Sequence, residues 1–77
     1  MFEGFEVLYV EDDPQVRESL VQTLELAGLN VRAFESAEGL LAAFVPGQPS
    51  VVVSDVRLPG MDGLALLERL LLLDATL

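Results

Sequence analysis

The predicted fold depends first on one segment of the chain, Val51-Val52-Val53-Ser54-Asp55-Val56-Arg57-Leu58-Pro59-Gly60-Met61-Asp62-Gly63. It starts with β-branched residues, which favour a strand, and Pro49 before it and Pro59-Gly60 after it bound that strand. A short run of this kind, apolar at each position, is typical of a buried parallel strand. Asp55 follows at the carboxyl end, which is where open α/β sheets bind their ligands.

The rest of the chain alternates strands with helices. The apolar periodicities predict the first strand over residues 5–10, a helix over 14–27 that ends before Gly28, a strand over 30–34, a helix that starts after Ser36, and a helix over 63–73 that Asp62 caps. Strands that alternate with helices over short connections indicate a parallel sheet with right-handed crossovers. The predicted fold class is therefore α/β, with three parallel strands and three helices.

The last predicted helix is unusually apolar. Its expected buried stripe consists of Leu64, Leu67, Leu70 and Leu71. Other leucines leave it hydrophobic over more than half its circumference, and a helix of this kind needs cover on more than one side. We therefore expect apolar surface that the three predicted helices and strands do not fully cover.

Composition excludes several classes of function. The 77 residues contain no cysteine and no histidine, which excludes disulfides, thiolate or imidazole metal ligands and histidine bases. The net charge of −9 comes from 13 acidic residues against four arginines, and lysine is absent, so binding to nucleic acid phosphates is not expected. No apolar run approaches a membrane span of about 20 residues, and the N-terminus lacks the basic region of a signal peptide. A soluble, cytoplasmic protein is expected.

Acidic side chains follow two of the predicted strands. Asp12 and Asp13 come after the first strand, and Asp55 ends the third. Parallel strands open onto the same carboxyl edge, and a flavodoxin-like strand order makes these two strands neighbours. Carboxylates that lie close together repel unless a cation neutralises them, and Mg²⁺ prefers oxygen ligands. The pattern favours phosphoryl transfer to an aspartate, although each acid taken alone could simply cap a helix or serve a loop.

These residues carry a family resemblance. Leu8-Tyr9-Val10-Glu11-Asp12-Asp13-Pro14, together with the stretch from Val51 to Gly63, resembles the receiver domain of two-component response regulators. The resemblance spans residues 1–77 and implies a flavodoxin-like (CheY-like) receiver fold of which this chain is the N-terminal portion, truncated after the third βα unit. The sequence of these segments is most similar to receivers of the nitrogen-regulatory and C4-dicarboxylate-transport class.

The resemblance also assigns roles to residues. It implies that Asp55 accepts a phosphoryl group from a sensor histidine kinase, and that Asp12, Asp13, Asp55 and the backbone carbonyl of Arg57 bind Mg²⁺. It implies a regulatory phospho-acceptor rather than an enzyme. The transcriptional output domain that such receivers normally control is not among these residues.

The chain departs from the family pattern after the third helix. Receivers carry a hydroxyl switch residue on a fourth strand and a lysine on a fifth, and neither strand is found here. One alternative is therefore a switch-incompetent interaction or folding fragment. Another is a Mg²⁺-dependent phosphohydrolase that passes through an aspartyl phosphate, although the adjacent Asp12-Asp13 pair does not match the Asp-x-Asp spacing of those enzymes.

The same departure predicts self-association. Without a fourth strand, residues 51–53 form an edge of the sheet, and an uncovered apolar edge can pair with another chain. We expect association, if it occurs, through this Val51–Val53 edge and the third helix.

Overall fold

The computed structural model describes residues 5–55 and 57–74. In that part of the chain the elements follow in the order β1 (Glu6–Val10), α1 (Pro14–Leu26), β2 (Val31–Phe34), α2 (Ala37–Ala43), β3 (Ser50–Ser54) and α3 (Gly63–Leu73). The predicted alternation of strands and helices is confirmed. The boundaries agree to within one residue wherever a start or an end was predicted, because proline, glycine or a capping side chain marks most of them.

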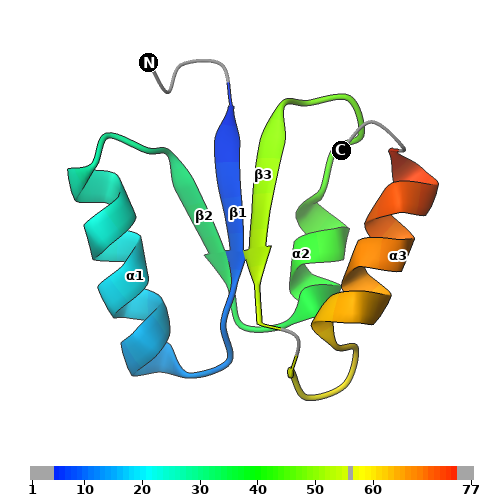
Figure 1. The fold of residues 1–77 in the computed structure, drawn as a ribbon, viewed down its shortest axis with the longest axis horizontal. Coiled ribbons are helices and arrows are strands. Elements are labelled where there is room, and N and C mark those ends of the chain that lie inside the picture. The colour runs from blue at the N-terminus through cyan, green and yellow to red at the C-terminus, as the bar shows by residue number, and fades with distance from the viewer. Residues whose placement is uncertain (1–4, 56, 75–77) are drawn as a thin grey trace.

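The strands form one parallel sheet in the order β2-β1-β3. Leu8 in the central strand lies opposite Arg32 of β2 and Val52 of β3. This order places β1 and β3 side by side, as the flavodoxin-like prediction requires. The carboxyl ends of all three strands consequently point the same way (Figure 1).

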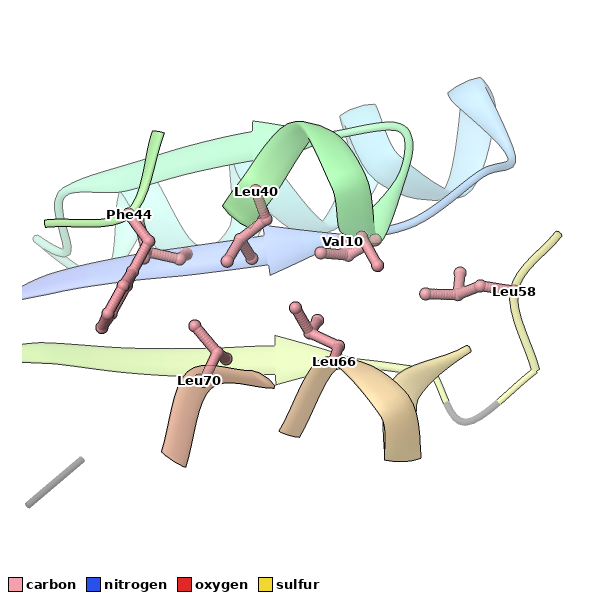
Figure 2. Packing of buried hydrophobic residues seen from close by; sticks show 8 residues of the cluster. Val10, Leu40, Phe44, Leu58, Leu66 and Leu70 are labelled. Carbon is pink, nitrogen blue, oxygen red and sulfur yellow. The ribbon is translucent and has the colours of Figure 1, made fainter. Parts of the chain in front are cut away.

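The helices cover the sheet unequally. Figure 1 shows α1 on one side of the sheet, beside β2, and α2 and α3 on the other side. The buried cluster lies on the side of α2 and α3, where Leu8 and Val10 of β1 pack among side chains from both helices. Figure 2 shows Leu40 and Phe44 of this cluster facing Leu66 and Leu70 of α3. No residue of α1 is buried, and on its face of the sheet only Val7 and Tyr9 of β1 are buried among the described residues, so most of the core lies on the side of α2 and α3.

Two predictions about burial are wrong. β3 is not a buried strand, because Val51 and Val53 remain 47% and 39% exposed. These two valines pair with Val7 and Tyr9 of β1, so they lie on the face of α1, which sits over β2 and does not reach them. That face of β3 is therefore left uncovered by the described chain.

The predicted buried stripe of α3 is also wrong in part. Leu70 is buried as expected, but Leu64, Leu67 and Leu71 are 59%, 50% and 42% exposed. The helix contacts the core through Leu66 and Leu70 instead. The periodicity alone could not select the face, because the helix is apolar nearly all round and only packing decides which leucines become buried.

The predicted capping residues are confirmed. The Ser36 hydroxyl accepts a hydrogen bond from the Gly39 amide at 3.1 Å, and the Asp62 carboxylate accepts one from the Ala65 amide at 2.9 Å. Gly28 follows α1 with a φ of 88°, a conformation that side chains other than glycine rarely adopt. These local signals fix where the helices begin and end.

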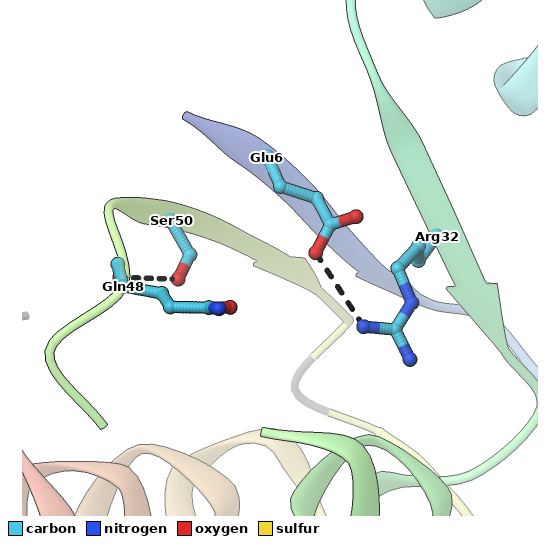
Figure 3. Close-up of polar contacts among 4 residues, drawn as sticks. All are labelled: Glu6, Arg32, Gln48 and Ser50. Carbon is cyan, nitrogen blue, oxygen red and sulfur yellow. Dashed lines mark hydrogen bonds and ion pairs between the residues drawn. The ribbon is translucent and has the colours of Figure 1, made fainter. Parts of the chain in front are cut away.

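Polar contacts secure the opposite end of the sheet. Glu6 of β1 forms an ion pair with Arg32 of β2, with Oε1 and Nη1 3.6 Å apart, and the Ser50 hydroxyl donates to the carbonyl of Gln48 at 3.0 Å (Figure 3). Both contacts lie at or near the surface, and an ion pair in such a position contributes about 0–1 kcal/mol. They lie away from the carboxyl edge and play no part in the candidate site.

Candidate functional site

The candidate site lies at the carboxyl edge of β1 and β3. The parallel register places Val10, the last residue of β1, opposite Ser54, the last residue of β3. The chain continues from Val10 into Glu11, Asp12 and Asp13, and from Ser54 into Asp55. The fold therefore brings together, at one edge, the two acidic segments that the sequence analysis selected.

Asp55 is exposed and its carboxylate is held on one side. Its Oδ1 atom accepts a hydrogen bond from the backbone amide of Arg57 at 3.1 Å, and the Ser54 hydroxyl donates to its backbone carbonyl at 2.9 Å. Within residues 5–55 and 57–74, its Oδ2 atom has no hydrogen-bond partner. This arrangement fixes the side chain while leaving one carboxylate oxygen open to solvent.

Asp13 caps α1. Its Oδ1 atom accepts hydrogen bonds from the amides of Gln15 at 2.9 Å and Val16 at 3.3 Å, and Pro14 occupies the first position of the helix. This is the capping role that the sequence analysis weighed as an alternative to metal binding. Because both bonds use Oδ1, the structure leaves the second oxygen of the same carboxylate unengaged by any described residue.

Asp12 is exposed and is the least constrained of the three acids. Its side chain forms no hydrogen bond or ion pair with any described residue. The hydrogen bonds of this loop hold Glu11 and Asp13, the residues before and after Asp12. The carboxylate of Glu11 accepts from the Asp13 amide at 3.3 Å, and the Arg17 side chain donates from Nη1 to the Glu11 carbonyl at 2.8 Å.

Tyr9, one residue before the end of β1, is buried. Burial raises the pKa of Tyr9 above its ordinary value of 10.0, and the negative charge of Glu11 and a hydrogen bond to its side chain add to the effect. The charge of Asp55 raises the pKa of Tyr9 further, whereas Arg17 opposes these contributions. The pKa of Tyr9 therefore depends on acidic residues of both loops.

The sequence analysis missed Tyr9, Glu11 and Arg17 as part of the site. Tyr9 and Glu11 entered the expectations only as part of the motif that resembles a receiver, and Arg17 was given no role. The only available signal was a cation one helical turn after a run of three acids. Spacing of that kind is common on exposed helices and does not by itself indicate a contact.

The acidic residues supply the kind of ligand atoms that a divalent cation binds, but the structure does not group three of them around one position in the described residues. Among the residues that the structure describes, no three histidine, cysteine, aspartate or glutamate side chains are grouped as metal ligands. Asp13 Oδ1 accepts from amides at the N-terminus of α1 and Asp55 Oδ1 accepts from the Arg57 amide, so one oxygen of each carboxylate is already engaged. The available donors are carboxylate and carbonyl oxygens, the ligands that Mg²⁺ prefers.

Comparison with known proteins establishes the family of this chain. Residues 7–77 match the model of the response regulator receiver domain. The chain belongs to this family. Receiver domains of response regulators are the regulatory phospho-acceptors of two-component phosphorelays, in which sensor histidine kinases are their partners.

Several transcriptional regulators contain a segment that is similar to this chain. The chain is 49% identical over 72 residues to the C4-dicarboxylate transport transcriptional regulatory protein DctD of Pseudomonas aeruginosa, covering 94% of this chain and 16% of the relative. It is 46% identical over 71 residues to DctD of Rhizobium meliloti, a match that covers 92% of this chain and 15% of that relative. It is 45% identical over 64 residues to the DNA-binding transcriptional regulator NtrC of Salmonella typhimurium, a match that covers 83% of this chain and 14% of that relative. The chain thus spans about one sixth of these relatives.

A solved structure supports the fold. A low-resolution structure of the response regulator StyR superimposes with a TM-score of 0.82 at 40% sequence identity, covering 87% of this chain and 34% of the other. This similarity confirms the receiver fold expected from the acidic motifs. In addition, none of the helices within the described residues has the length and apolar character needed to cross a membrane.

Proposed function

We propose that this receiver takes part in phosphorelay signalling by accepting a phosphoryl group on Asp55 from a sensor histidine kinase. The observation that carries the proposal is the position of Asp55. It is exposed, it follows β3 directly at the edge it shares with Asp12 and Asp13, and the Arg57 amide holds one of its carboxylate oxygens. No other acidic residue of the described chain combines these three properties.

The proposed reaction is a transfer between two side chains. The Oδ2 atom of Asp55 attacks the phosphorus of a phosphohistidine, forming an O–P bond as the P–N bond breaks, and the electron pair of that bond returns to the imidazole. The product on this chain is an acyl phosphate. The Arg57 amide keeps Oδ1 engaged throughout, so that Oδ2 faces the donor.

Mg²⁺ is the proposed cofactor. Asp12, Asp13, Asp55 and the backbone carbonyl of Arg57 would hold it, with Asp13 offering the oxygen that does not cap α1. When bound, the ion would neutralise the charge of the incoming phosphoryl group. Asp12 needs no rearrangement of hydrogen bonds to contribute, because no described residue engages its carboxylate.

The relatives suggest the output of the signal. DctD and NtrC are transcriptional regulators, and the region of this chain that is similar to them is the region that matches the receiver model. We therefore propose that phosphorylation of this receiver controls a transcriptional output domain. The net charge of −9 argues that these 77 residues do not themselves bind DNA.

Mass spectrometry tests the proposed acceptor. The protein is incubated with acetyl phosphate and Mg²⁺, and its intact mass is compared with that of Asp55→Asn and of the control Asp62→Asn. The proposal predicts one base-labile phosphoryl group on the wild type and the control and none on Asp55→Asn. Two results would contradict it: no adduct on a folded wild type, or an adduct that survives in Asp55→Asn. Turnover of a generic phosphate ester would instead support the phosphohydrolase alternative.

Self-association through the β3 edge is a separate part of the proposal. Val51 and Val53 are exposed, and a groove of about 430 Å³ lies between β3 and α3, lined in part by Val52, Leu67 and Leu70. β3 carries no charged residue, so two copies of this acidic chain could approach there with the least repulsion. Sedimentation should show a concentration-dependent dimer that Val51→Lys weakens, and a monomer at all concentrations would refute it.

A further inference from the structure

Arg17 holds the chain on both sides of Asp12. Its guanidinium Nη1 donates to the carbonyl of Glu11 at 2.8 Å, and its own backbone amide donates to the carbonyl of Asp13 at 2.9 Å. The first contact spans six positions in the sequence and is partly buried, whereas the second is the first regular bond of α1. A single residue thus anchors the peptide before Asp12 and the peptide after it.

The remaining contacts of the loop do not replace this anchor. The Glu11 amide donates to the carbonyl of Phe34 at 3.0 Å, which fixes the loop where it leaves β1. The Asp13 amide donates to the Glu11 carboxylate at 3.3 Å, a longer bond in an exposed setting. Without the Arg17 side chain, no described donor would hold the Glu11 carbonyl, and the direction of the following residue would be less defined.

We infer that Arg17 is a positioning residue for the acid pair. It fixes the backbone of Glu11 and Asp13 so that the otherwise unconstrained carboxylate of Asp12 stays at the edge shared with Asp55. It acts through its hydrogen bond to the Glu11 carbonyl and not through contact with a phosphoryl group. Its link to cation binding rests on the proposed function, whereas its hold on the loop does not.

The first experiment uses the metal-free protein. Amide chemical shifts and hydrogen exchange at Asp12 and Asp13 are compared in the wild type, Arg17→Met and Arg17→Lys. Arg17→Met should accelerate exchange and shift these amides, and Arg17→Lys, which retains a donor of similar reach, should restore them. Arg69→Met is the matched control, because it removes the same charge from an exposed position on α3. Unchanged Asp12 and Asp13 amides in Arg17→Met would overturn the inference.

The second experiment measures Mg²⁺ binding through Tyr9, the only tyrosine in a chain without tryptophan. Arg17→Met should weaken binding by about tenfold, the lower end for loss of an outer-shell contact, while Arg17→Lys and Arg69→Met stay near the wild type. If Arg17 acted only as a nearby positive charge, its removal would leave binding unchanged or tighten it, and the inference would fail. A wild type that binds no Mg²⁺ would refute the proposed cofactor, whereas the metal-free comparison would still decide the role of Arg17.

Discussion

Val10 and Ser54 lie opposite each other where β1 and β3 end. Because the strands are parallel, both chains leave the sheet at this point in the same direction, and the next residues are Glu11 on one strand and Asp55 on the other. The pairing explains how acids more than 40 positions apart in the sequence share one edge. It also explains why the site depends on strand register, since a shift of one residue would turn these side chains to the other face.

Asp13 should have two separable roles. Asp13→Ala removes both hydrogen bonds to the amides of Gln15 and Val16, and should lower the free energy of unfolding by about 0.5–2 kcal/mol. Asp13→Asn keeps a capping oxygen and should unfold nearly as the wild type does, while its response to Mg²⁺ weakens. Urea denaturation and a Mg²⁺ titration check these outcomes. Equal Mg²⁺ affinity in Asp13→Asn would show that Asp13 only caps the helix.

Leu66 should be essential to the core between the sheet and helices α2 and α3. It is 1% exposed, and Leu66→Ala should lower the free energy of unfolding by about 2–5 kcal/mol, which is a large share of the stability of so small a domain. Leu72→Ala is the control on the same helix, because Leu72 is 83% exposed and its truncation should cost less than about 0.5 kcal/mol. Similar costs for the two variants, measured by urea denaturation, would contradict the packing of α3.

Tyr9 should couple stability to alkaline pH. Its pKa is raised above 10.0 in the folded chain, first by burial, so the folded protein binds the phenol proton more tightly than the unfolded chain does. The corresponding stabilisation is complete below pH 10 and is lost as the pH rises through the folded pKa. Titration of tyrosinate absorbance should give a midpoint above 10.0, and Tyr9→Phe should lose this part of the pH dependence. A midpoint at or below 10.0 would argue against burial next to Glu11.

Local signals in the sequence predicted the helices and strands, and the flavodoxin-like pattern predicted the order of the strands. Asp62 and Ser36 cap their helices as expected, Gly28 follows the first helix, and the strand order places β1 beside β3. Burial was harder to predict. The exposed leucines of α3 and the exposed valines of β3 follow from which neighbours the described chain provides, and the periodicity of a single element carries no information about its neighbours.

The site was predictable at the level of segments but not of side chains. The order of the strands allowed Asp12, Asp13 and Asp55 to be placed at one edge, because parallel strands share it. The hydrogen bonds of Asp13 to α1 and of Asp55 to the Arg57 amide were not predicted, because they depend on the conformation of the two loops. The anchor from Arg17 to the Glu11 carbonyl was missed, since side chain to backbone contacts of this length leave no pattern in the sequence.

The most direct test of the central claim is to locate the phosphoryl group. The protein is treated with acetyl phosphate and Mg²⁺, the acyl phosphate is reduced with borohydride to homoserine, and the peptides are sequenced by mass spectrometry. We expect homoserine at position 55 alone, with Asp12, Asp13 and Asp62 unmodified. Modification of Asp12 or Asp13 in place of Asp55 would contradict it, because the acceptor would then lie on the loop after β1 and not at the end of β3.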